Sequence, residues 1–342
     1  MPIQRLIRTV RRGMAAATMT CRKKKLAGED VVEFGTDAVA GSPTAGGGEG
    51  GSPPRLSLEF GHALLPHPEK VRKGGEDAYF CNTFLNAFGV ADGVGAWSTM
   101  GVDPAKFSRA LMRYSEQAIA DNDETLTPIQ ALRVAYDAVR QESIQGSCTA
   151  VVGVLRGSCL HIANLGDSGV LVLTRKAHGT AVDHINEDVE LLHPRQNAIP
   201  PTFRILYKTV DQLHRFNCPF QLGLESSDAP EVASVSAHTL HPGDLVVAGT
   251  DGLWDNLFKH DIVRLADTTD DPQELAFVIA TTAQRRSAKT RGPKATPFAV
   301  AAAEAGIIFE GGKLDDITVV VGRVVEYTER KSRSDISLKS SL

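Results

Sequence analysis

Short apolar runs separated by turn residues fill the middle of this chain, and they restrict it to a fold built on β-strands. Residues 148–174 hold three of them, CTAVVGVL, CLHIANL and GVLVLT, broken at Arg156-Gly157 and Gly166-Asp167. Runs of this length with many β-branched residues are typical of strands. We therefore predict an antiparallel meander over 148–174. The same pattern predicts further strands at 77–82, 86–91, 244–250 and 317–325.

Helices are indicated by a recurrent start signal, a capping oxygen directly before a proline. An Asp or Thr side chain accepts from a free backbone N–H, and proline suits the first helical position because it has no N–H to satisfy. The signals are Asp103-Pro104, Thr127-Pro128, Asp271-Pro272 and Thr296-Pro297. Blocks of strands alternate with pairs of helices, without the strict repeat of a parallel sheet. We expect an α+β fold, an antiparallel β-sandwich of two sheets flanked by helix pairs in four αββα layers.

The overall composition is that of a globular protein and narrows the possible partners. Of 342 residues, 42% are hydrophobic and 23% are charged. A formal net charge of -4 offers no chain-wide attraction for nucleic acid. No run of about 18 apolar residues is present to span a bilayer. The five cysteines lack the spacing of zinc ligands, which favours free thiols in a reducing compartment.

The two ends of the chain differ from this average. Residues 1–28 are rich in arginine and lysine, and the first acidic residue is Glu29. A basic, acid-poor segment with an apolar helical stripe is typical of an organellar transit peptide, and a disordered basic tail or nucleic-acid arm is the alternative. We interpret residues 29–55 as a flexible Gly/Ser/Pro-rich linker, 56–328 as the folded domain and 329–342 as a disordered tail.

Acidic residues at the ends of the apolar strands are the feature most informative about function. A carboxylate beside a buried strand is costly unless a cation or a donor network compensates it. The acids in such places are Glu76, Asp77, Asp92, Asp167, Asp251, Asp315 and Asp316. Each one alone is better explained as a turn acceptor. Together they indicate a site, because a glycine follows both Asp92 and Asp251 and lets backbone approach a ligand closely.

The predicted cluster contains only hard oxygen ligands. Without His or Cys it favours Mg2+ or Mn2+ over zinc. Because Mg2+ keeps several waters, four or five carboxylates suffice for two ions. Two ions about 3.5–4 Å apart lower the pKa of a shared water and clamp a phosphate. Phosphate monoesters hydrolyse very slowly without a catalyst, so a charge-neutralising centre of this kind suits them.

Six motifs together resemble one known family. They are RKGGEDAYF, FGVADGVGAW, GSCTAVVGVL, IANLGDSGVLVL, VVAGTDGLWDNL and KLDDITVVVGRV. In this order they resemble the PPM-type (type 2C) metal-dependent Ser/Thr protein phosphatases, over about residues 56–325. FNCPFQLGL and TPFAVAAAEAGIIFEGGKLDDIT resemble the subgroup targeted to mitochondria or plastids. The resemblance implies hydrolysis of phosphoserine or phosphothreonine in phosphoproteins by metal-activated water.

The resemblance also implies a set of metal ligands. Asp92 would bridge two ions, and the carbonyl of Gly93 would bind one of them. Asp251 and Asp315 would complete the first position, and Glu76 would complete the second. Asp92 would therefore be central to catalysis.

Other positions would assist these ligands. The resemblance implies that Asp77 holds a metal-bound water and that Asp167 contributes to a loosely held third metal. Arg72, four residues before Glu76, would bind the substrate phosphate through its forked guanidinium. Asp316 stands where the family usually has Asn, so we expect it to be a neighbour of the ligands.

One position departs from the family pattern. Many members have a histidine, assigned as the general acid, where this chain has Val94. Metal-bound water or another group would then protonate the leaving oxygen. His62 and His67 precede Arg72 and are candidates, and the general acid stays unassigned.

Two other functions remain as alternatives to a protein phosphatase. A pseudophosphatase would bind partners without turnover, but its hallmark, loss of a metal-binding acid, is missing here. A hydrolase of small phosphorylated metabolites would use the same motifs. We expect a monomer without nucleic-acid partners, located in the mitochondrial matrix, with the chloroplast as the alternative.

Overall fold

The computed structural model describes residues 24–26, 29–31, 55–122, 125–175, 202–290 and 295–327. The first two of these ranges are a short strand pair, β1 (Lys24–Leu26) and β2 (Glu29–Val31). The rest of the expected transit peptide and most of the expected linker lie outside the described residues. The expected C-terminal tail, 329–342, lies outside them completely.

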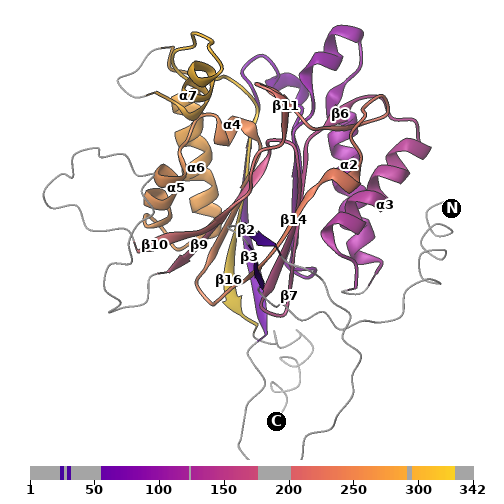
Figure 1. The fold of residues 1–342 in the computed structure, drawn as a ribbon. Coiled ribbons are helices and arrows are strands. Elements are labelled where there is room, and N and C mark those ends of the chain that lie inside the picture. The colour runs from indigo at the N-terminus through magenta and orange to yellow at the C-terminus, as the bar shows by residue number, and fades with distance from the viewer. Residues whose placement is uncertain are drawn as a thin grey trace, which may run out of the picture.

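Two five-stranded antiparallel sheets stand at the centre of the fold (Figure 1). The first has the order β10-β9-β15-β16-β3 and the second β14-β8-β7-β5-β4. The first sheet consists of β3 (Leu56–Leu65), β9 (Gly169–Arg175), β10 (Phe203–Lys208), β15 (Leu245–Gly249) and β16 (Ile317–Glu326). The second consists of β4 (Ala78–Asn82), β5 (Ala87–Ala91), β7 (Ala150–Arg156), β8 (Cys159–Leu165) and β14 (Ser234–Thr239). Short strands outside these sheets are β6 (Ser147–Cys148), β11 (Leu213–Arg215), β12 (Cys218–Pro219) and β13 (Leu222–Gly223).

Helices cover both outer faces of the sandwich (Figure 1). α2 (Pro104–Ala120) and α3 (Pro128–Gln141) pack on the second sheet, where their apolar faces share a core with β5 and β7. α5 (Lys259–Ala266) and α6 (Pro272–Ser287) pack on the first sheet in the same way. The shorter α4 (Asp251–Trp254) and α7 (Pro297–Glu304) lie near one end of the sandwich. The expected αββα arrangement is confirmed.

A third core joins the inner faces of the two sheets. Phe88, 1% exposed, reaches into it from β5 and meets Phe60 of β3 edge to face, with ring centroids 6.2 Å apart. A side chain at Gly153 would begin 2.2 Å from the Phe88 ring, so this glycine provides the room for the phenylalanine. Strands with a core on each side must be apolar on both faces, which explains the continuous apolar runs in the sequence.

The predicted helix starts are confirmed. α2, α3, α6 and α7 each begin at the proline of the signal. The side chain of Asp103 accepts from the N–H of Ala105 at 3.2 Å, and that of Thr296 accepts from Ala299 at 3.2 Å. No helix in the described part of the chain is long and apolar enough to cross a membrane.

The prediction of a meander over 148–174 was wrong in its last step. β7 and β8 pair as an antiparallel hairpin, as expected, but β9 pairs with β10 and β15 in the other sheet. The chain crosses between the sheets at Gly166, whose φ of 98° is open to glycine but strained for other residues. Local patterning indicates a turn there, whereas the choice of partner strand depends on distant β15.

Candidate metal centre

The strand register brings acids of the second sheet to one end of the sandwich. Ala78 at the start of β4 pairs with Ala91 at the end of β5. Asp77 precedes the first of these residues and Asp92 follows the second, so the two acids leave neighbouring strands at the same edge. Asp167 follows β8, in the segment that crosses to the first sheet.

The first sheet brings its acids to the same end. Gly249, the last residue of β15, pairs with Val319 near the start of β16. Asp251 then begins α4, which lies near this end in Figure 1, and Asp315 lies two residues before the start of β16. Both sheets therefore direct acids from strand ends, rather than strand centres, into one place.

The electrostatics confirm that these carboxylates lie near one another. Withdrawal from water raises the pKa of Asp92 well above its usual range, and repulsion from other carboxylates raises it further. Those carboxylates are Asp251, Asp77, Asp315 and Asp167. Burial and the neighbouring charges raise the pKa of Asp167 to about 8 and that of Asp315 to about 6. So much negative charge in one place requires cations.

Several buried oxygens of the cluster have no hydrogen-bond donor. They are Oδ1 of Asp77, Asp167 and Asp251. A buried acceptor without a donor is costly, and a metal ion or its bound water would satisfy it. Gly93 packs closely against the loop that carries Glu76, since a Cβ there would lie 2.5 Å from the carbonyl oxygen of Glu76. The donor set is therefore suited to Mg2+ or Mn2+.

Lysine ammonium groups lie between the carboxylates. Lys70 Nζ is 2.6 Å from Glu76 Oε2 and 3.2 Å from Asp316 Oδ2. Lys313 Nζ is 2.5 Å from Asp251 Oδ2. Among the residues that the structure describes, no group of three or more His, Cys, Asp or Glu side chains lies close enough together to hold one metal ion. The acids are gathered around the two ammonium groups.

Asp77 is held by hydrogen bonds to only one of its two carboxylate oxygens. Its Oδ2 accepts from the hydroxyl of Thr250 at 2.8 Å and from that of Thr318 at 2.7 Å. Both threonines belong to the first sheet region, so Asp77 also ties the two sheets together. Its other oxygen is left without a donor, which suits the expected role of holding a water.

Asp316 is fully engaged with the loop before β4. It accepts from the backbone N–H of His67 at 2.7 Å and from that of Glu76 at 2.8 Å, in addition to its contact with Lys70. These bonds position Glu76 at the cluster. The expectation that Asp316 is a neighbour of the ligands stays a prediction.

Arg72 lies apart from this network. It is exposed on a short 3-10 turn, Val71–Lys73, and makes no hydrogen bond or ion pair with another described residue. Its expected contact with substrate phosphate stays a prediction. Lys70, two residues earlier, is the cation of this turn that contacts the acids.

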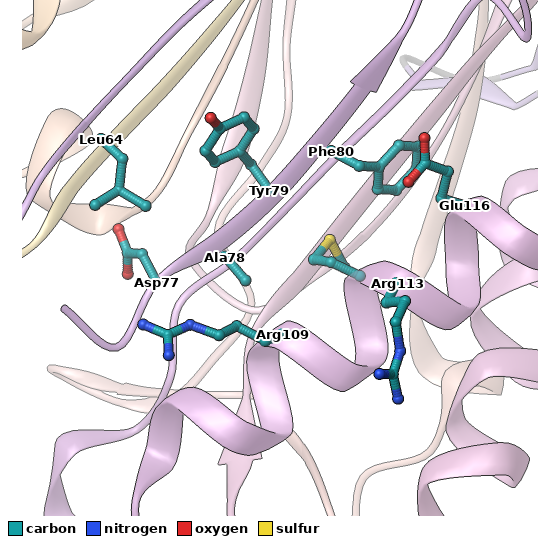
Figure 2. Close-up of a pocket in the computed structure, with 9 residues that line it drawn as sticks. Leu64, Asp77, Ala78, Tyr79, Phe80, Arg109, Arg113 and Glu116 are labelled. Carbon is teal, nitrogen blue, oxygen red and sulfur yellow. The ribbon is translucent and has the colours of Figure 1, made fainter. Parts of the chain in front are cut away.

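A pocket of about 300 Å³ lies between β4 and α2, with Asp77 among its lining residues (Figure 2). Arg109 of α2 lines the same pocket and donates to the carbonyl oxygen of Gly75 at 3.1 Å. It thereby supports the loop that carries Glu76. Glu116, at the other end of the pocket in Figure 2, accepts from the side chain of Asn82 at 3.0 Å.

The position of the missing histidine offers no proton donor. Val94 is half-buried, and its backbone N–H donates to the carbonyl oxygen of Ser147 at 2.9 Å. His62 is exposed and lies against the ring of Tyr79, with centroids 4.8 Å apart. His67 approaches the cluster through its backbone, which donates to Asp316. The general acid stays unassigned.

Comparison with known proteins decides the family. The protein phosphatase 2C family model matches residues 59–190. "Probable protein phosphatase 2C 26" of Arabidopsis thaliana is 32% identical over 286 residues, which cover 80% of this chain and 85% of the relative. This chain belongs to the protein phosphatase 2C family.

Other members of the phosphatase 2C family extend this comparison. "Probable protein phosphatase 2C 55" of Arabidopsis thaliana is 37% identical over 280 residues, which are 80% of this chain and 53% of the relative. The chain therefore spans about half the length of that relative. A solved structure described as the photosystem II phosphatase PBCP is 30% identical, with a TM-score of 0.66. The match covers 79% of this chain and 100% of that one.

Sequence reasoning missed three charged residues of this cluster. Asp255 lies one helical turn after Asp251, and its N–H donates to the Asp251 carbonyl oxygen at 2.7 Å. The spacing of four in TDGLWDN was a usable signal, since it puts both acids on one face of a helical turn. Lys70 and Lys313 lie within motif regions, but nothing in their spacing shows that they point into the cluster.

Proposed function

We propose that this chain acts as a monomer that hydrolyses phosphoserine and phosphothreonine in organellar proteins at a centre for two Mn2+ or Mg2+ ions. The observation that carries the proposal is the convergence of strand-end acids from both sheets, with buried oxygens that have no donor. When bound, the ions would supply an activated water and neutralise the phosphate charge. Membership of the phosphatase 2C family supports this reading.

The residues of the chain have separate tasks in the proposed reaction. Asp92, Asp251, Asp315 and Glu76 would hold the ions, with the Gly93 carbonyl beside them. Asp77, fixed by its two threonine donors, would orient a water through its free oxygen. Hydrolysis would be direct, without a covalent phosphoenzyme.

Removing metal tests this proposal. The full chain in excess chelator is expected to lose at least about 100-fold of its rate toward a phosphothreonine peptide, because the ions would supply both the activated water and charge that balances the phosphate. Added Mn2+ or Mg2+ should restore the rate, measured as released phosphate. Full activity in chelator would contradict the mechanism. A clear preference for small phosphorylated metabolites over the peptide would instead favour the metabolite hydrolase.

We also propose that residues 1–28 direct import into an organelle. Their basic, acid-poor composition supports mitochondrial import. The similar structure described as a photosystem II phosphatase is a reason to test chloroplasts in parallel. A fusion of residues 1–28 to a fluorescent protein is expected to enter the mitochondrial matrix. The same fusion with Arg5, Arg8, Arg11 and Arg12 changed to glutamine should stay outside, and equal distribution of the two fusions would refute the proposal.

A further inference from the structure

Lys313 is held by three carboxylates at once. Its Nζ lies 2.5 Å from Asp251 Oδ2, 2.7 Å from Asp255 Oδ2 and 3.4 Å from Asp315 Oδ2. The carboxylates come from two separated parts of the chain, α4 with its C-terminal flank and the approach to β16. One ammonium therefore balances several negative charges, as a bound metal ion would.

The backbone of Lys313 is fixed so that its side chain stays in this position. The N–H of Lys313 donates to Asn256 Oδ1 at 3.1 Å, and Asn256 Nδ2 donates to the carbonyl oxygen of Lys313 at 2.9 Å. Asn256 is 0% exposed, so the clamp is itself buried. The ammonium also lies 5.1 Å from the ring centroid of Phe298. A lysine on an exposed loop would not have these backbone hydrogen bonds to a buried side chain or the contact with an aromatic ring.

We propose that the Lys313 ammonium fills a cation position formed by Asp251, Asp255 and Asp315 and competes there with a divalent metal ion. This inference rests on the metal centre of the proposed function. A divalent ion can enter this position only by displacing the ammonium. The ion held there should therefore bind more weakly to the wild type than to a variant without the ammonium.

Calorimetric titration of the full chain with Mn2+, in the absence of substrate, tests the inference. Lys313→Met removes the charge and keeps most of the side-chain volume, and Lys313→Arg keeps the charge. Lys289→Met is the matched control, because Lys289 is exposed and belongs to the neighbouring loop. Thermal unfolding at rising Mn2+ measures the same affinities through the rise in Tm and does not require a stable metal-free variant.

We expect Lys313→Met to bind one more Mn2+ ion than the wild type, or to bind its weakest ion roughly 10- to 100-fold more tightly. Lys313→Arg and Lys289→Met should titrate like the wild type. Unchanged or weaker Mn2+ binding by Lys313→Met would overturn the inference, as would an equal gain in the Lys289→Met control.

The titration separates this inference from the proposed function. A wild-type chain that binds no Mn2+ would refute both. Two bound ions with no effect of Lys313→Met would refute only the role of Lys313. A gained or tightened ion in a protein without phosphatase activity would uphold the cation position and refute the proposed reaction.

Discussion

Replacing Asp92 with asparagine is expected to lower kcat on the order of 10³-fold and to weaken Mn2+ binding together with it. Asp92 directly follows β5 at the point where acids from both sheets meet, and its charge interacts with four other carboxylates. An amide has one acceptor oxygen and no charge, so it cannot bridge two cations. Steady-state kinetics on a phosphothreonine peptide and calorimetric Mn2+ titration measure the two losses.

The same substitution should not damage the fold. The carboxylate of Asp92 is repelled by its neighbours, which is why its pKa is raised, so a neutral side chain removes unfavourable energy from the metal-free protein. Its Tm in chelator should be equal to or higher than that of the wild type. Asp103→Asn is the matched control, because Asp103 is an exposed helix cap and asparagine caps equally well. Wild-type kinetics in Asp92→Asn would show that Asp92 does not belong to the metal centre.

Replacing Phe88 with alanine is expected to reduce the free energy of unfolding by about 3–5 kcal/mol. Phe88 is 1% exposed between the sheets, against Phe60, and Gly153 leaves a space shaped for its ring. The strands on either side are held by their hydrogen-bond ladders, so the sandwich cannot collapse to fill the cavity. Urea unfolding in excess chelator measures the loss without a contribution from bound metal.

Phe84 supplies the matched control for this substitution. It is 93% exposed in the loop between β4 and β5, only four residues away. Phe84→Ala should change the free energy of unfolding by less than about 0.5 kcal/mol. Similar losses in both variants would show that the sheets do not depend on the Phe88 contact.

Local signals predicted most of the secondary structure. Capping at Asp103, Thr127, Asp271 and Thr296 depends only on adjacent residues, and all four helices begin where these signals place them. The strands of the apolar runs were found for the same reason. The partner strand of β9 was not predicted, because its pairing with β15 joins segments about 75 residues apart.

The acids of the site could be found because strand ends are visible in sequence and a carboxylate there is conspicuous. Their mutual distances could not, since these depend on the register of both sheets. Asp255 was overlooked although its spacing from Asp251 is local. Lys70 and Lys313 could not have been assigned to the cluster from sequence, because their ammonium groups contact Asp316 and Asp251, which are far away in the chain.

The sequence by itself determined the layer architecture, the helix starts and the identity of the acids, since each follows from residues a few positions apart. Only the tertiary structure decided which strands share a sheet, that Arg72 stays exposed while Lys70 meets Asp316, and that Lys313 stands among Asp251, Asp255 and Asp315. The physical reason is that these features are long-range charge and packing contacts. They exist only after two sheets, formed from distant segments, have closed on a common core.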